Sequence, residues 1–139
     1  MKVRNQAIFI IALLSMAILA GCGEPVETIE ITSEGTFSGL QCKAHNPDYE
    51  VVMLESKYCG HCKETLPKFL EACEELGIKP IVLDLADAED ATIAKEKYKV
   101  RIKYTPTFIF GCNYVVGTQP TKESYSNLLN TYQEMEGQQ

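Results

Sequence analysis

Short runs of β-branched and aromatic residues alternate with amphipathic stretches along most of this chain. Strands are predicted where apolar runs are short and bounded by turn residues: 28–32, 50–54, 80–85, 107–110 and 114–116. A helix is predicted from Cys62 to Gly77, where apolar residues recur at helical spacing. Another is predicted from Asp87 to Lys99, where acids precede lysines in the order that the helix dipole favours. Shorter signals predict a helix within 37–44, before a turn, and one after Thr121. The order is strand, helix, strand, helix, strand, helix, hairpin, helix, which predicts an α/β fold.

The last part of this pattern predicts a hairpin followed by a helix. The loop Gly111-Cys112-Asn113 separates the two hairpin strands. Thr121 is placed to cap the last helix, whose inward-facing residues are predicted to be Tyr125, Leu128, Leu129 and Tyr132.

The chain has 139 residues, which is enough for one compact domain with its own core.

Residues 1–21 have the composition of an export signal rather than of a folded element. Lys2 and Arg4 give a basic start, and the apolar run that follows is shorter than the roughly 20 residues that a membrane-spanning helix needs. We therefore expect a tether with a first strand over 22–35 and the folded domain over 36–139.

The segment Leu19-Ala20-Gly21-Cys22 resembles the lipobox of bacterial-type lipoproteins. The resemblance implies cleavage before Cys22 and a lipid on its sulfur, so that the protein is an extracytoplasmic lipoprotein on the periplasmic or cell-surface side of a membrane. The alternative is ordinary signal-peptidase cleavage with a free Cys22. An exported chain with six cysteines is compatible with stable disulfides.

The charge balance argues against nucleic acid as a partner. The chain has 13 lysine and arginine residues against 19 acidic ones, a formal net charge of -6. The sequence contains no basic patch, and nucleic-acid binding depends on the attraction of basic residues to phosphate groups.

The stretch Cys59-Gly60-His61-Cys62 carries the strongest chemical signal, because it lies between a predicted strand and a predicted helix. That position places both sulfurs on the first helical turn, where the helix N-terminus favours thiolate over thiol at Cys59. A zinc half-site and a purely structural bridge are the alternatives. Zinc needs a second ligand pair at similar spacing, which Cys42, Cys73 and Cys112 do not provide. The pair therefore predicts redox chemistry.

Together with the order of elements, four further motifs resemble the thioredoxin-like superfamily over residues 37–135. They are Pro67 in the helix after the cysteines, the segment Tyr104-Thr105-Pro106-Thr107, Gly117, and a Cys-Gly-His-Cys-Lys string of the kind seen in protein disulfide isomerase domains. The resemblance implies the thioredoxin fold, a central mixed β-sheet flanked by helices on both faces.

The resemblance also implies roles for individual residues. Cys59 is the expected nucleophile, Cys62 the resolving thiol, and His61 a group that stabilises the Cys59 thiolate and so the reduced form. Pro106 is expected in a cis peptide facing the disulfide, with Thr105 offering backbone groups to a substrate strand. No metal or organic cofactor is expected.

Two departures from the family pattern affect the site. Met53 occupies the strand position where family members usually carry a buried acid. Glu55 lies two residues further on the same strand face and is the candidate proton relay, the alternative being an exposed charge at the rim. Tyr58 replaces the tryptophan that normally precedes the motif, and the chain contains no tryptophan.

The remaining cysteines are assigned from their places in the pattern. Cys73 falls on the apolar stripe of its helix and is expected to be a buried free thiol. The strands 50–54 and 107–110 must run antiparallel if Cys59 and Pro106 face each other, which favours a Cys42–Cys112 disulfide at the opposite end. Pairings that include Cys73 remain the alternatives. His45 has no such context and is expected to be exposed.

The sequence thus predicts a membrane-anchored thiol-disulfide oxidoreductase that acts on protein cysteines and exchanges electrons with a membrane redox partner. His61 and the compartment favour oxidation or isomerisation, but a reductase would use the same residues. An alternative of another class is a soft-metal (copper) chaperone or redox-sensing lipoprotein, with Cys59, His61 and Cys62 binding the ion.

Overall fold

The computed structural model describes residues 25–136. The predicted export signal over 1–21 and the predicted lipid site at Cys22 lie outside the described residues. Within 25–136, no helix has both the length and the apolar character needed to cross a membrane.

The elements follow one another along the chain as β1 (Ile29–Ile31), β2 (Gly35–Thr36), α2 (Gly39–His45), β3 (Val51–Glu55), α3 (Gly60–Glu75), β4 (Ile81–Asp84), α4 (Ala88–Glu96), β5 (Val100–Ile102), β6 (Thr107–Phe110), β7 (Asn113–Val116) and α5 (Lys122–Glu136). All five predicted strands are confirmed to within one residue at either end. The predicted Thr121 cap is also confirmed, because its Oγ1 accepts the Ser124 N–H at 3.2 Å.

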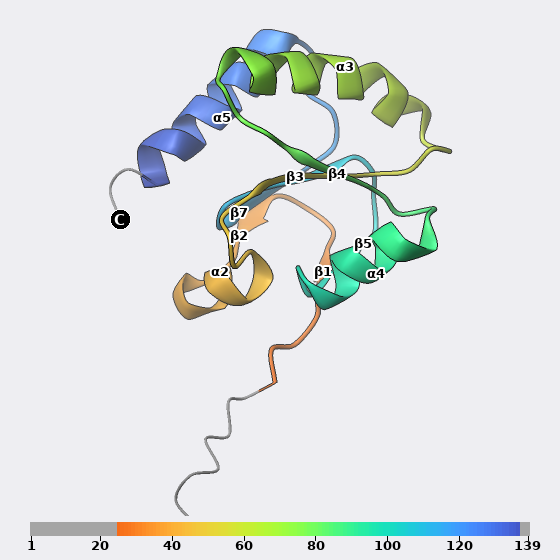
Figure 1. Ribbon diagram of the computed structural model, residues 1–139, viewed down its shortest axis with the longest axis vertical. Coiled ribbons are helices and arrows are strands. Elements are labelled where there is room, and N and C mark those ends of the chain that lie inside the picture. The colour runs from red at the N-terminus through yellow and green to blue at the C-terminus, as the bar shows by residue number, and fades with distance from the viewer. Residues whose placement is uncertain (1–24, 137–139) are drawn as a thin grey trace, which may run out of the picture.

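Five strands form one mixed sheet in the order β2-β7-β6-β3-β4. The central strand β3 pairs parallel with β4 and antiparallel with β6. Helices α3 and α5 cover one face of the sheet, and α2 and α4 cover the other (Figure 1). The predicted fold class, a central mixed sheet with helices on both faces, is confirmed.

The core lies on both faces of β3, because its residues Val51–Leu54 are all apolar and buried. Met53 faces α3 and α5, where Phe69, Phe108 and Tyr125 form an aromatic cluster with ring centroids 5.0–5.8 Å apart. Leu54 points to the opposite face, toward the side chains that α2 and α4 bury. The segment with Cys59 and Cys62 therefore follows a strand, β3, whose apolar side chains are buried on both faces of the sheet.

Two short strands were not predicted. The sequence pattern predicts no element over 100–102, but Val100–Ile102 form β5, which pairs parallel with β1 in a separate two-stranded sheet. The turn expected at Glu34-Gly35 instead continues into β2, which adds to the edge of the main sheet beside β7. Runs of two or three residues are too short to show a period, so only their partners identify them.

The expectation that His45 is exposed is wrong. Its side chain is 1% exposed, its Nδ1 lies 3.0 Å from the Tyr98 carbonyl oxygen, and its ring stacks on Phe37 with centroids 4.6 Å apart. A histidine can be buried when one ring nitrogen is hydrogen-bonded and the ring faces are packed. Neither partner is visible in the local sequence.

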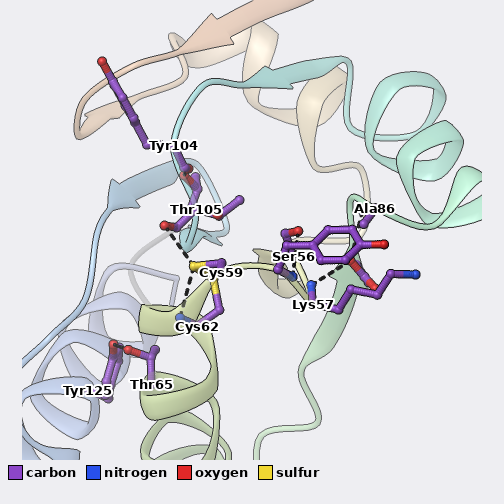
Figure 2. The surroundings of a disulfide bond; sticks show 12 residues. Ser56, Lys57, Cys59, Cys62, Thr65, Ala86, Tyr104, Thr105 and Tyr125 are labelled. Atoms are coloured by element: carbon purple, nitrogen blue, oxygen red, sulfur yellow. Dashed lines mark hydrogen bonds between the residues drawn. A yellow bond between two sulfur atoms is a disulfide. The ribbon is translucent and has the colours of Figure 1, made fainter.

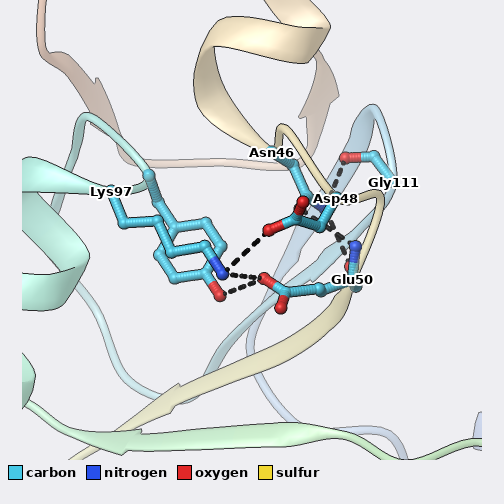
Figure 3. Close-up of polar contacts among 6 residues, drawn as sticks. Asn46, Asp48, Glu50, Lys97 and Gly111 are labelled. Carbon is cyan, nitrogen blue, oxygen red and sulfur yellow. Dashed lines mark hydrogen bonds and ion pairs between the residues drawn. The ribbon is translucent and has the colours of Figure 1, made fainter.

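A polar network closes the end of the sheet next to His45 (Figure 3). The Asn46 amide donates to the carbonyl oxygens of Glu50 and Gly111, and its Oδ1 accepts the Glu50 N–H. Lys97 pairs with Glu50 at 2.6 Å and with Asp48 at 3.2 Å. The hydrogen bond to Glu50 and the neighbouring Asp48 raise the pKa of Lys97, so the lysine stays charged. The turn into β3 is thus fixed on both sides.

The favoured pairing of Cys42 with Cys112 is confirmed, with their α-carbons 5.0 Å apart. The disulfide joins α2 to the β6–β7 turn at the same end of the sheet as the polar network. Cys73 is buried and free, as predicted. Burial raises the pKa of its thiol to about 12, so the group stays neutral and unreactive at ordinary pH.

Opening the Cys42–Cys112 bond should destabilise the fold substantially. The bond links residues 70 positions apart, and the chain-entropy model assigns such a loop about 4 kcal/mol of unfolding free energy. Urea denaturation of Cys42→Ala/Cys112→Ala without reductant measures the loss. The matched control is Cys59→Ala/Cys62→Ala, which opens a link with a separation of only 3. An equal loss in the two double variants would contradict the expectation.

Candidate active site at the start of helix α3

The two cysteines of the motif lie at the point where the chain leaves β3 and enters α3 (Figure 2). Cys59 is the N-cap residue of α3, and its Sγ accepts the Cys62 N–H at 3.1 Å. The two sulfurs form a disulfide. Cys59 is partly exposed, whereas Cys62 is 0% exposed. A partner can therefore reach the first sulfur but not the second.

The electrostatics of the helix end favour a negative charge at Cys59 once the disulfide is reduced. The free N–H groups of the first turn point toward Cys59, and α3 has no acidic residue in that turn to oppose a thiolate. Cys62 lies among apolar side chains, including Met53 and Phe69, which favour a neutral thiol. The two sulfurs are thus placed in unlike surroundings.

The loop before β6 meets Cys59 from the other side, as expected. The Thr105–Pro106 peptide bond is cis, and the Thr105 carbonyl oxygen lies 3.4 Å from the Cys59 Sγ. Gly117, whose φ is 95°, donates its N–H to the Pro106 carbonyl at 2.8 Å. The predicted approach of Thr105, Pro106 and Gly117 is therefore confirmed. A reduced Cys59 thiol could donate a hydrogen bond to the Thr105 oxygen.

His61 occupies the first turn of α3 between the two cysteines, and its side chain is exposed. From this position the imidazole is accessible to solvent and to an approaching partner.

Glu55 is the last residue of β3 and is half-buried. Partial burial raises the pKa of its carboxyl, the charges of Asp84 and Asp90 raise it further, and Lys63 opposes them. Asp84 is the residue opposite Glu55 in the β3–β4 pairing. The carboxyl is therefore neither a fully exposed rim charge nor a buried acid in the core.

A buried pair of hydroxyl groups near the cysteines was not predicted from the sequence. Thr65, one turn after Cys62, lies with its Oγ1 3.5 Å from the Tyr125 Oη, and both side chains are buried (Figure 2). The Gln119 N–H donates to the same Tyr125 oxygen at 2.8 Å. A threonine at the i+3 position from Cys62, facing a tyrosine already predicted to point inward, was the available signal.

Over residues 25–136, no group of three or more histidine, cysteine, aspartate or glutamate side chains is placed to hold a metal ion.

The raised pKa of Glu55 predicts that its ionised form costs stability. Above the pKa that Glu55 has in the folded protein, the ionised carboxylate is disfavoured by burial and by like charges, which lowers the free energy of unfolding. Below the pKa of the unfolded chain, Glu55 is protonated in both the folded and the unfolded protein, and this loss of stability disappears. Glu55→Gln should therefore raise the melting temperature at pH 7, and the gain should disappear below about pH 4. Thermal unfolding across this pH range measures it. The exposed Glu64→Gln controls for net charge, and a loss of stability at pH 7 in Glu55→Gln would refute the interpretation.

Relatives in the curated proteins are plant protein disulfide isomerases. The chain is 27% identical over 109 residues to protein disulfide isomerase-like 1-1 of Arabidopsis thaliana, which covers 77% of this chain and 22% of that protein. It is 29% identical over 102 residues to a protein disulfide-isomerase of Ricinus communis, covering 72% and 20%. The chain thus spans about a fifth of the length of these relatives.

Solved structures that resemble the chain include two thioredoxins. A mutant thioredoxin of Halobacterium salinarum has 18% identity and a TM-score of 0.45, covering 81% of this chain and 96% of its own. A poplar thioredoxin h has 22% identity and a TM-score of 0.36, covering 70% and 84%. The thioredoxin family model matches residues 33–132, which include both disulfides and the loop at Pro106. The chain belongs to the thioredoxin family.

Proposed function

We propose that this protein is a thiol-disulfide oxidoreductase that exchanges disulfides with protein cysteines through Cys59 and Cys62. The observation that carries the proposal is the unequal placement of the two sulfurs. Cys59 is accessible at a helix N-terminus and 3.4 Å from the Thr105 oxygen, while Cys62 is buried directly behind it. Membership of the thioredoxin family and the similarity to protein disulfide isomerases support this activity.

The exchange proceeds in two displacements. The Cys59 thiolate attacks one sulfur of a substrate disulfide, so that a mixed disulfide forms and the other substrate sulfur leaves as a thiolate. The Cys62 thiol then loses its proton and attacks the Cys59 sulfur, which restores the Cys59–Cys62 disulfide and releases the second substrate thiolate. Two electrons pass from the protein dithiol to the substrate, and the reverse sequence oxidises a substrate dithiol.

Glu55 is the proposed proton acceptor for the Cys62 thiol. It lies at the end of β3 that leads into the motif, and its raised pKa brings it closer to the range useful for proton transfer. Met53 leaves the usual position of the acid apolar. If Glu55 acts in this way, Glu55→Gln slows the second displacement more than the first.

The proposed location is the outer side of a membrane, with the domain held by lipid on Cys22. The predicted export signal over 1–21 and the resemblance of residues 19–22 to a lipobox support this proposal. A structural disulfide between Cys42 and Cys112 is also typical of proteins in oxidising compartments. A membrane protein that exchanges thiols and disulfides would reset the Cys59–Cys62 pair after each turnover.

The order of attack is tested by trapping. Cys62→Ser leaves a mixed disulfide on Cys59 with no internal thiol to release it, so it should accumulate covalent complexes with partner proteins. Cys59→Ser should accumulate almost none, because Cys62 is buried. Non-reducing electrophoresis followed by mass spectrometry of the linked peptides measures both. Equal trapping by the two variants would show that the assigned order is wrong.

The proposed direction depends on His61. If the imidazole stabilises the Cys59 thiolate, His61→Pro should destabilise the reduced form and make the couple more reducing by tens of millivolts, where about 30 mV corresponds to about 1.4 kcal/mol. Equilibration with glutathione measures the potential. An unchanged potential would remove the argument for an oxidant or isomerase and favour the reductase.

A further inference from the structure

Two exposed tyrosines flank the redox pair, one on each of the loops that meet at Cys59. Tyr58 is 82% exposed and immediately precedes Cys59, and Tyr104 is 52% exposed and immediately precedes Thr105. The Thr105 oxygen lies 3.4 Å from the Cys59 Sγ, so the segments that carry the two tyrosines meet at the accessible sulfur, although the Tyr104 ring itself points away from it (Figure 2). Exposed aromatic side chains at such a position supply contact area to a docked chain.

Each of these tyrosines follows a lysine whose ammonium lies over its ring. The Nζ of Lys57 is 5.5 Å from the Tyr58 ring centroid, and the Nζ of Lys103 is 5.5 Å from the Tyr104 centroid. Figure 2 shows Lys57 and Tyr104 on opposite sides of Cys59. A cation–π contact at an exposed site is weak, and it favours positions of each ammonium near its ring.

In a third lysine–tyrosine pair of the chain, Lys97 and Tyr98, the lysine also forms ion pairs with carboxylates. The Nζ of Lys97 lies 5.2 Å from the Tyr98 ring centroid, and it also contacts the carboxylates of Glu50 at 2.6 Å and Asp48 at 3.2 Å (Figure 3). Neither Lys57 nor Lys103 forms an ion pair within residues 25–136. Both ammonium groups therefore remain able to receive a carboxylate from another molecule.

The two segments that meet at Cys59 are more basic than the chain as a whole. Residues 56–64 and 103–107 contain three lysines and one acidic residue, in a chain whose net charge is -6. Acidic groups also lie nearby on β3, β4 and α4, and backbone hydrogen bonds to a carboxylate do not remove its charge, so a partner carboxylate competes with Asp84 for Lys57. The Asp84 carboxylate, which attracts Lys57, accepts the N–H groups of Lys57 and Ala86, and the Asp90 carboxylate accepts the Asp84 N–H.

We infer that the surface around Cys59 selects partner segments that carry acidic residues beside the reacting cysteine. Tyr58 and Tyr104 contact the segment, and Lys57 and Lys103 pair with its carboxylates. The inference rests on the proposed function, which it deepens by naming the substrate class. Because these ion pairs are exposed, each contributes little alone, and we expect a measurable preference only from both lysines together. The preference should weaken at high salt.

The experiment uses three peptides that differ only in the residues flanking one cysteine: glutamate, glutamine or lysine. Each cysteine is capped as a mixed disulfide with 2-mercaptoethanol, and the second-order rate constant with the reduced protein is measured at low and high salt. The glutamate peptide should react about fivefold faster than the lysine peptide at low salt, and the ratio should approach one at high salt. A ratio of one at low salt, or a preference for lysine, would overturn the inference.

Matched variants separate the local effect from the overall charge. Lys57→Gln/Lys103→Gln should abolish the glutamate-to-lysine ratio, which is compared within each variant so that changes in thiol reactivity cancel. Lys43→Gln/Lys95→Gln removes the same charge from exposed positions on α2 and α4 and should retain the ratio. Loss of the ratio in both double variants would overturn the inference. Absence of exchange with every peptide and with the neutral bis(2-hydroxyethyl) disulfide would refute the proposed function, and the inference with it.

Discussion

Strands β3 and β6 lie side by side in the centre of the sheet and run in opposite directions, with Val51 opposite Phe110 and Leu54 opposite Thr107. This register places the chain leaving β3 beside the chain entering β6, which brings Cys59 to Thr105. It also places the chain entering β3 beside the chain leaving β6, which brings α2 to Cys112. A slip of one residue would turn the buried faces of β3 toward the wrong helices. One pairing therefore brings Cys42 to Cys112 and Cys59 to Thr105.

The interactions that hold this register are concentrated at the end of the sheet away from the exchange chemistry. Asn46 joins the turn before β3 to Gly111, the Phe37 N–H donates to the Cys112 carbonyl at 2.7 Å, and the Cys42–Cys112 bond makes the link covalent. At the other end of the sheet, the Cys59 Sγ and the Thr105 carbonyl oxygen lie 3.4 Å apart, with no covalent bond between the two loops. The site can thus open and close its disulfide while the register is maintained elsewhere.

Much of this arrangement could be predicted from the sequence because it depends on local periodicity and on chain direction. The Cys42–Cys112 bond followed once the two central strands had to be antiparallel. What could not be predicted depends on partners distant in the chain. His45 is buried because Phe37 and the Tyr98 carbonyl receive its ring, and β5 exists because β1 lies beside it. The Thr65–Tyr125 contact likewise needs the packing of α5 on α3, which neither helix specifies alone.

The methionine at position 53, where the family usually has an acid, affects the second displacement more than the first. The helix N-terminus favours the thiolate form of Cys59, but Cys62, surrounded by apolar side chains, must give up a proton before it can attack. With methionine in the core, the carboxyl that remains on this strand face is Glu55, at the end of β3. The partial burial and the neighbouring charges of Asp84 and Asp90 that disfavour its ionised form also increase its affinity for a proton. The same causes therefore lower the stability of the folded protein and raise the pKa of Glu55. In the proposed reaction, that raised pKa is what allows Glu55 to accept the Cys62 proton.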